Sequence, residues 1–284
     1  MRETSGLQAR YLLVVGLAVV MGLSVALPVF AADGGPQPQV VGGEPVANGD
    51  FPFVASLGDV RYGGTAYTRH FCGASLIDRD SVLTAAHCVQ DNPRRPLRVV
   101  VGRTVLSGDG GQSRRVSKKL VHPRFNGTSD VKYDAAILTL NAPVQGIPTL
   151  SPAGAARDGL EEPGSLATVA GWGDTTRQPP RGGGESNYPD RMHVVRVPMV
   201  SDARAREVYG PSFVGTLMVA AGKEGKDACL GDSGGPLFAT RDGERHQIGI
   251  ASFGYGCATM KYPGVYTEVN ARPIRTFIAN AAGQ

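Results

Sequence analysis

Residues 226–237 of the chain read "KDACLGDSGGPL". This stretch places one serine, Ser233, among three glycines, with Asp232 directly before it and Asp227 six residues before it. Glycine allows sharp turns and a close approach of the backbone to another group. A serine hydroxyl becomes a useful nucleophile only when a base lies beside it. Ser233 is therefore either a turn residue or a nucleophile, and the rest of the chain must distinguish the two.

One candidate interpretation is the nucleophile elbow of α/β-hydrolases, because residues 231–235 satisfy the G-x-S-x-G pattern. That elbow needs a helix straight after the serine, and its histidine follows later in the chain. Here Gly-Gly-Pro and a strand-like segment, 237–240, follow Ser233, and residues 234–284 contain a single histidine, His246. The sequence therefore disfavours an α/β-hydrolase esterase.

The opposite order, histidine then aspartate then serine, fits the chain better. His87 lies in "LTAAHC", residues 83–88, and Asp134 begins "DAAIL", residues 134–138. Asp130 is a rival acid, but it lies in a turn-like segment without a following apolar strand, so we interpret it as a surface residue. We interpret the remaining histidines as core or surface groups: His70, His122, His193 and His246.

Composition predicts an all-β protein built from barrels or sandwiches. The 284 residues include 39 glycines and 20 prolines, which favour turns and short strands. Only two segments favour helices, 202–209 behind a capping Ser201 and a terminal one from Pro273 to about residue 280. The segments that read as strands are 97–103, 135–140, 166–171, 193–200, 247–253 and 265–269.

The first 39 residues predict export. Residues 11–27 are an apolar run behind two arginines, and the run ends in small residues at 31–32. We expect a signal peptide over 1–32 and a short pro-segment over 33–39. A membrane anchor is the less favoured alternative because the run is short for a span. The mature protein is therefore expected to be secreted and free of the membrane.

The net charge and the cysteine content limit the kinds of partner and metal site that we expect. The net charge of +4 is mild and does not indicate a nucleic-acid partner. Basic clusters at 94–95, 114–115 and 118–119 read as solvated faces, with a docking role less favoured. Four cysteines in an exported protein predict two disulfides in one of three pairings, and the lack of a C-x-x-C pair disfavours zinc.

Seven motifs in order carry a family resemblance that spans residues 40–284. The chain resembles the trypsin-like serine proteases of the chymotrypsin fold, in particular secreted actinobacterial trypsins. This implies two packed antiparallel six-stranded β-barrels, over about 55–150 and 160–270, with a short C-terminal helix over about 272–281. The motifs are "VVGG" (40–43), "CGASLI" (72–77), "LTAAHC" (83–88), "DAAIL" (134–138), "GWG" (171–173), "GDSGGP" (231–236) and "PGVYTEV" (263–269).

The resemblance implies a catalytic triad for a secreted endopeptidase that cuts after arginine or lysine through an acyl-enzyme. His87 would take the proton of Ser233, and Asp134 would orient the imidazole and stabilise its cation. The backbone N–H groups of Gly231 and Ser233 would form the oxyanion hole. A catalytically silent homologue that acts as a binding module is the alternative, and it is disfavoured because no triad residue is lost.

The two acids of the opening stretch receive different roles from the resemblance. Asp227 would lie at the base of the specificity pocket and select a cationic side chain. Ala228, where many trypsins have serine, implies a preference for arginine over lysine. The pocket walls would be Ser252, Phe253, Gly254 and Gly264. Asp232 would pair with the amino group of Val40 after zymogen cleavage, and Gln39 implies that another protease makes that cut.

The resemblance also fixes the disulfides and partners that we expect. Cys72 would pair with Cys88 and Cys229 with Cys257, while Ala205 and Ala220 replace a third pair. The expected partners are protein or peptide substrates with arginine or lysine, and protein inhibitors. We expect no cofactor, no metal and a monomer.

Overall fold

Short antiparallel strands joined by glycine- and proline-rich turns make up most of the described chain. The computed structural model describes residues 40–92, 94–127, 130–154 and 159–282. The signal peptide and the pro-segment expected over 1–39, together with Gln39, lie outside these described residues.

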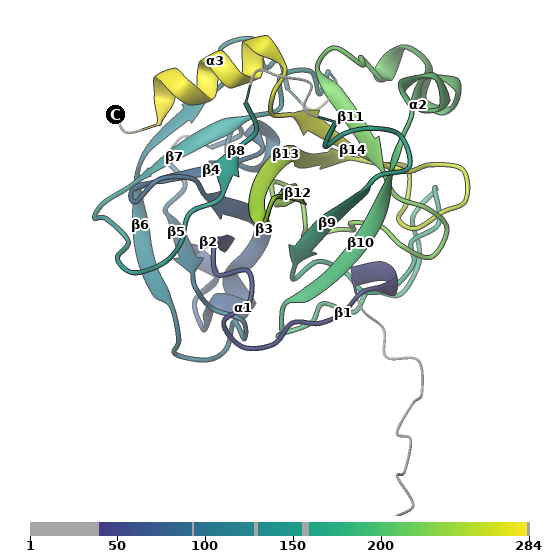
Figure 1. Cartoon of the computed structure of the whole chain (residues 1–284). Coiled ribbons are helices and arrows are strands. Elements are labelled where there is room, and N and C mark those ends of the chain that lie inside the picture. Colours follow the sequence, from purple (N-terminus) through teal and green to yellow (C-terminus); the bar gives the residue numbers. More distant parts are fainter. Residues whose placement is uncertain (1–39, 93, 128–129, 155–158, 283–284) are drawn as a thin grey trace, which may run out of the picture. The chain divides into compact units, whose positions relative to one another are not determined.

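Six strands close the first barrel in the order β2-β3-β4-β7-β6-β5, with every neighbour antiparallel. Figure 1 shows these strands in purple to teal. The strands are β2 (Val54–Asp59), β3 (His70–Leu76), β4 (Ser81–Thr84), β5 (Leu97–Val101), β6 (Gln112–Val121) and β7 (Ala136–Leu140).

Six further strands close the second barrel in the order β10-β11-β14-β13-β12-β9, because β9 also pairs with β10. Two short strands extend this sheet: β1 (Glu44–Pro45) pairs with β10, and β8 (Ser151–Pro152) runs parallel to β13. The barrel strands are β9 (Leu166–Gly171), β10 (His193–Val200), β11 (Met218–Ala221), β12 (Pro236–Arg241), β13 (Glu244–Phe253) and β14 (Gly264–Glu268). The prediction of two antiparallel six-stranded barrels is confirmed.

Two helices lie in the segments that the sequence favoured, whereas the short helix α1 was not predicted. In α2 (Asp202–Tyr209) the Ser201 side chain accepts from the Arg204 backbone N–H. The terminal helix α3 (Arg272–Ala281) has proline in its first turn and buries one apolar face on the first barrel. The other helical segments are α1 (Ala66–Arg69) and the 3-10 turns η1 (Val40–Gly42), η2 (Val60–Tyr62), η3 (Ala86–Cys88) and η4 (Gly210–Ser212).

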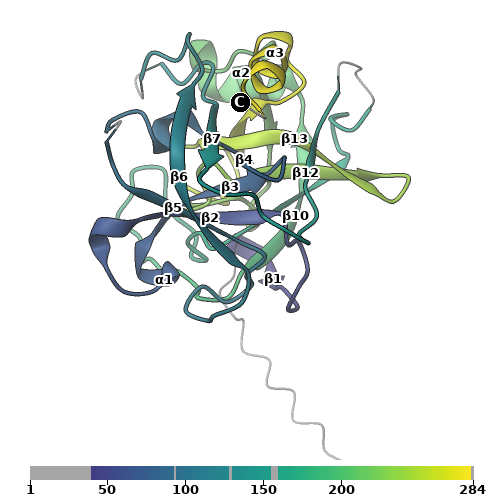
Figure 2. The ribbon, with the colours of Figure 1, turned by 90° about the vertical axis from the view of Figure 1, so that its left-hand side faces the viewer.

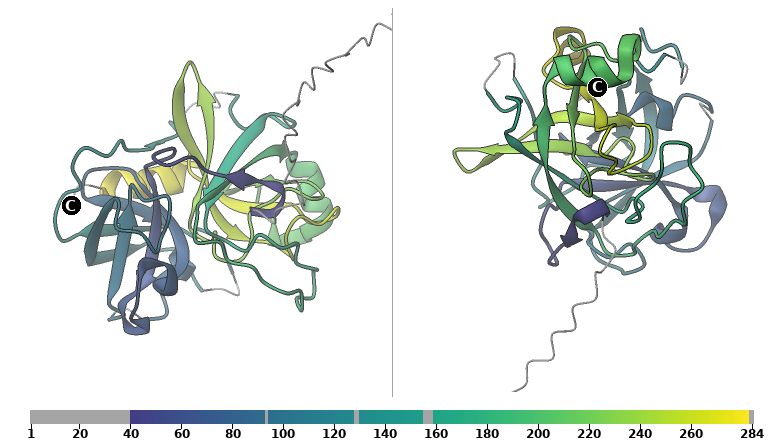
Figure 3. Two further views of the ribbon diagram at one scale, coloured as in Figure 1. Left: turned by 90° about the horizontal axis from the view of Figure 1, so that it is seen from below. Right: turned by 90° about the vertical axis from the view of Figure 1, so that its right-hand side faces the viewer.

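Each barrel has its own core, and a third cluster joins them. Phe53, which precedes β2, packs edge-on against Phe238 of β12 with ring centroids 5.3 Å apart. Burying such an aromatic or aliphatic side chain contributes about 1.5–3 kcal/mol. The barrels lie side by side (Figure 3, left), and the β12–β13 hairpin extends from the second one (Figure 2). Residues at the junction therefore come from both barrels.

Candidate active site

Strand pairing brings His87 and Asp134 together in the first barrel. His87 lies in η3 just after β4, Asp134 lies just before β7, and these two strands pair with Thr84 opposite Ala136. The His87 backbone N–H donates to Asp134 Oδ1 at 2.9 Å, and His87 Nδ1 lies 2.7 Å from Asp134 Oδ2. The carboxylate therefore fixes both the backbone and the ring of the histidine.

The second barrel holds the same carboxylate from the other side. The Ser252 hydroxyl of β13 donates to Asp134 Oδ2 at 2.6 Å, and the Thr267 hydroxyl of β14 donates to the Asp134 carbonyl at 3.0 Å. Asp134 is completely buried. The sequence placed Ser252 only in a pocket wall and gave no role to Thr267, because both contacts depend on how the barrels pack.

The environment of His87 favours its protonated form. Burial lowers the pKa of His87, but the hydrogen bond and charge of Asp134 outweigh it, so the pKa is raised above its ordinary value. A raised pKa makes the neutral imidazole a better proton acceptor. The ring can therefore act as a base for a neighbouring hydroxyl.

A tight loop between Cys229 and β12 presents Ser233. The Asp232 N–H donates to the Cys229 carbonyl at 2.9 Å, and Gly234 has a φ of 80° that favours glycine. A Cβ on Gly234 would lie 2.2 Å from the Thr84 hydroxyl. The loop thus packs directly on the strand that leads to His87.

Ser233 itself is anchored through its backbone. Its carbonyl accepts from the Gly73 N–H of β3 at 2.8 Å. The Cys88 sulfur lies 3.6 Å from that carbonyl and 3.7 Å from His87 Nε2, so it lies between the two residues. Among the described residues no hydrogen bond joins Ser233 Oγ to His87 Nε2, and apo sites often have such a bond long or misaligned.

Two backbone N–H groups beside Ser233 are free to bind an anion. Within the described residues, the N–H groups of Gly231 and Ser233 have no hydrogen-bond acceptor. Gly231 has a φ of 95°, in the left-handed region that favours glycine. Unpaired N–H groups at a partly exposed turn can stabilise a developing oxyanion.

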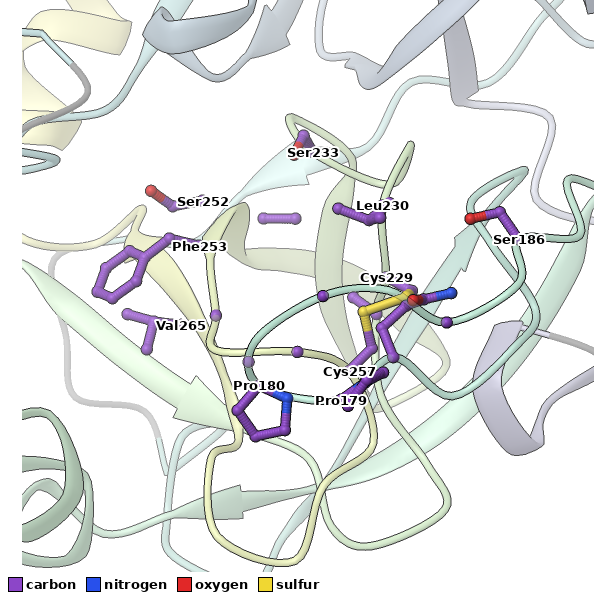
Figure 4. A pocket seen from close by; sticks show the side chains of 18 of the residues that line it. Pro179, Pro180, Ser186, Cys229, Leu230, Ser233, Ser252, Phe253, Cys257 and Val265 are labelled. Atoms are coloured by element: carbon purple, nitrogen blue, oxygen red, sulfur yellow. A yellow bond between two sulfur atoms is a disulfide. The ribbon is translucent and has the colours of Figure 1, made fainter.

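A cavity of about 470 Å³ opens next to Ser233 (Figure 4). Of the residues expected to form it, Ala228, Ser252, Phe253, Gly254 and Gly264 line the cavity. The loop at 178–184 also lines the cavity, and the sequence gave no indication of this. Cys257 N–H donates to the Gln178 carbonyl at 2.9 Å, and this contact places that loop against the cavity.

Asp227 lies behind this cavity with one oxygen unpaired. It is 1% exposed, and the Ala258 N–H donates to its Oδ2 at 3.2 Å, whereas its Oδ1 has no partner. A Cβ on Gly264, which lines the cavity, would lie 2.7 Å from that Oδ1 and 3.3 Å from the Tyr266 hydroxyl, which is unpaired too. Asp227 Oδ1 and the Tyr266 hydroxyl therefore both lack a hydrogen-bond partner close to Gly264.

Burial raises the pKa of Asp227 to about 8, although the hydrogen bond from the Ala258 backbone N–H opposes the shift. The negative charge of Asp232 adds to the increase. A buried carboxylate without a cation favours its neutral form. A cationic group in the cavity would reverse this preference.

Asp232 points away from the cavity. Its Oδ1 accepts from the Gly173 N–H at 2.9 Å and its Oδ2 from the Cys229 N–H at 3.0 Å, and burial raises its pKa to about 6. Val40 is completely buried in the core of the second barrel. None of the described hydrogen bonds joins Val40 to Asp232. The adjacent Val41 carbonyl accepts from the Asp227 N–H at 3.2 Å.

Two disulfides brace the site. Cys72 is joined to Cys88, next to His87, and Cys229 is joined to Cys257 at the cavity wall. The Cys72, His87 and Cys88 ligand atoms lie within 4.8 Å of one another, but both sulfurs are in a disulfide and cannot act as thiolate ligands. Ala205 and Ala220, at the positions of the absent third pair, are both buried in one apolar cluster.

Comparison with known proteins agrees with this geometry. Residues 40–278 match the family model described as Trypsin. The chain is 38% identical to Trypsin-1 of Astacus astacus over 81% of this chain and 95% of that protein. It is 36% identical to a trypsin of Saccharopolyspora erythraea, over 82% and 94%, and 35% identical to a trypsin-like protease of Streptomyces glaucescens, over 89% and 86%.

The helices of the described segments offer no membrane span. None of them is both long and apolar enough to cross a bilayer.

Proposed function

This chain belongs to the trypsin family and is a serine endopeptidase, and we propose that it is secreted and cleaves after arginine, or less readily lysine. The observation that carries the specificity is the unpaired Asp227 Oδ1 beside the cavity. Leaving a buried carboxylate oxygen unpaired is costly. A guanidinium in the cavity supplies both the missing donor and the missing charge.

The proposed chemistry begins with Ser233 and His87. The Ser233 hydroxyl attacks the carbonyl carbon of the scissile peptide while His87 Nε2 accepts its proton. Asp134 holds the ring through Nδ1, at 2.7 Å, and stabilises the imidazolium. The N–H groups of Gly231 and Ser233 donate to the oxyanion, and each such donor contributes about 3 kcal/mol.

The second half of the reaction regenerates the serine. His87 returns its proton to the leaving amine, so the C–N bond breaks and an acyl-enzyme remains on Ser233 Oγ. Water then attacks the ester carbon while His87 accepts a proton from it. The carboxylic acid leaves as Ser233 Oγ takes that proton back.

Ala228 supports the preference for arginine. It lines the cavity next to Asp227 but offers no hydroxyl to a short ammonium group. A guanidinium reaches the carboxylate with two N–H groups, whereas an ammonium acts as a point charge. Matched peptide amides that differ only in arginine or lysine test this, and a kcat/KM for lysine equal to or above that for arginine would overturn it.

Release of Val40 is the proposed activation step. A signal peptide over 1–32 and a pro-segment over 33–39 would be removed, and the new amino group would pair with Asp232. The buried position of Val40 and the inward position of Asp232 support this pairing. Since Gln39 precedes the cut, another protease performs it. N-terminal sequencing of the secreted protein checks both cleavages.

Hydrolysis of an arginyl amide tests the function as a whole. The mature protein should cleave it, and Ser233→Ala should retain the fold and the two disulfides but lose the activity. Persistent activity of purified Ser233→Ala would contradict the assignment of the nucleophile. A silent binding homologue is not favoured, since His87, Asp134 and Ser233 are all present.

A further inference from the structure

Six cationic side chains from three chain segments lie close together on the first barrel. We call them the basic patch: Arg61, Arg94, Arg95, Arg98, Arg115 and Lys119. At its centre, Arg61 and Arg95 both contact Asp59 Oδ2, at 2.7 and 2.6 Å. Lys119 Nζ donates to the Arg95 carbonyl at 2.8 Å. These contacts join Arg61 and the segment at 115–119 to the segment at 94–98.

Strand register places two of these arginines against each other. Arg98 of β5 lies directly opposite Arg115 of β6, and the two strands run side by side (Figure 2). Like charges directly opposite on neighbouring strands are destabilising. Arg98 donates to the Ser113 hydroxyl at 3.3 Å, and within the described chain neither arginine forms an ion pair. A ligand of opposite charge would remove this repulsion.

The segments that form the basic patch carry an excess of positive charge. Residues 59–61, 91–98 and 112–121 together hold eight lysines and arginines but only two acids, Asp59 and Asp91. Asp59 is completely buried, and its two arginines hold its pKa well below its usual range. The exposed field over this surface is therefore positive.

The basic patch begins at the edge of the candidate active site. The Arg95 guanidinium carbon lies 3.9 Å from the centre of the Phe71 ring. Phe71 lines a cavity of about 410 Å³ together with Gly231. The specificity cavity borders the same loop, at Leu230 and Ser233. The two cavities therefore lie on either side of the loop that carries Ser233. The basic patch adjoins the cavity lined by Phe71, and Asp227 lies behind the other one.

We propose that the basic patch binds acidic residues on the leaving-group side of the scissile bond of a protein substrate. This inference rests on the proposed function, which places the side chain before that bond in the cavity at Asp227. The residues after the bond then cross Gly231 toward Phe71 and Arg95. We place the acids three to six residues past the bond, where an extended chain that advances about 3.3 Å per residue has moved roughly 10–20 Å from Ser233.

Paired peptides test the proposal. Two internally quenched substrates share every residue up to the scissile arginine and the two residues after it. They then differ only in four glutamates or four glutamines. At low salt we expect the acidic peptide to have about a fivefold higher kcat/KM, and 0.5 M NaCl should reduce the preference below about twofold because salt screens exposed charges.

Arg98→Gln with Arg115→Gln is the decisive variant. It removes the repelling pair, so folding is not at risk, and it should abolish the preference while leaving cleavage of the glutamine peptide unchanged. Arg204→Gln with Arg206→Gln removes the same charge from α2 and should keep the preference. Equal cleavage of both peptides at low salt would overturn the proposal, even if a sulfated polysaccharide bound the basic patch. Loss of cleavage of both peptides by the unmodified enzyme would instead contradict the proposed function.

Discussion

Ser252 of the second barrel donates a 2.6 Å hydrogen bond to Asp134 of the first, on the same oxygen that lies 2.7 Å from His87 Nδ1. One carboxylate therefore joins the two barrels and orients the proposed base. The position of the histidine depends on the packing of both halves of the fold.

Removing the Ser252 hydroxyl should weaken this junction. Ser252→Ala leaves a buried charged oxygen with one donor fewer, and hydrogen bonds to charged groups contribute about 1.5–3 kcal/mol. We expect the free energy of unfolding to fall by about that amount in chemical denaturation. Because Asp134 loses a stabilising donor, the pKa of His87 should rise further and the acid limb of kcat/KM should move to higher pH. An unchanged pH profile would show that Ser252 does not position the pair.

Asp134→Asn should show how far Asp134 acts by orienting the His87 ring and how far it acts by filling space. The amide keeps the volume but removes the charge and favours the wrong tautomer, and in serine-protease triads this change costs about 10⁴-fold in kcat. Burial then lowers the pKa of His87 with only the charge of Asp91 opposing it, so that pKa should fall and any residual activity should begin at lower pH. Proton NMR of the imidazole checks the direction, and an unshifted or higher pKa would contradict the account.

Asp227 predicts a pH dependence of stability with a definite sign. Its pKa is about 8 in the folded state and near 4 when unfolded. Between these values the folded protein holds a proton that the unfolded chain has lost. The free energy of unfolding should therefore fall as pH rises from about 4 to 8, by up to about 1.4 kcal/mol per pH unit from this group. Asp227→Asn should flatten that slope.

Binding of a cationic ligand gives a second measurement of the protonation of the Asp227 carboxyl group. Benzamidinium should bind in the cavity with its amidinium at Asp227, which ionises the acid and releases close to one proton near pH 7. Calorimetry in two buffers of different ionisation enthalpy measures that release. Asp227→Asn should lose both the binding and the proton. Tight binding without proton release would show that Asp227 is already ionised in the free enzyme.

The pairing of Asp232 with a free Val40 predicts an alkaline limit. An α-amino group has a pKa of about 8, and pairing with the carboxylate should raise it. The stabilisation is complete below about pH 8 and is lost as pH rises through the raised value. Asp232→Asn should lower activity of the mature enzyme and move the remaining alkaline limb to lower pH. A mature variant with full activity at every pH would exclude the pairing.

The sequence predicted local structure well because turns and strand periodicity are local signals. The expected strands at 166–171 and 193–200 and the helix at 202–209 agree with the structure at both ends. It did not predict that Ser252 donates to Asp134, that the loop at 178–184 borders the cavity, or that Arg98 faces Arg115. Each of these depends on barrel packing or strand register, which no short stretch of sequence specifies.

The role of Asp227 in specificity is tested by comparing Asp227→Ser with the unmodified mature enzyme on two matched peptide amides, one with arginine and one with leucine before the scissile bond. The unmodified enzyme should prefer arginine by at least about 10³-fold in kcat/KM. Asp227→Ser should lose most of that preference because its kcat/KM falls for the arginine substrate and stays unchanged for the leucine substrate. The uncharged pocket no longer offers a partner for the cation. An arginine preference that survives Asp227→Ser would contradict the account.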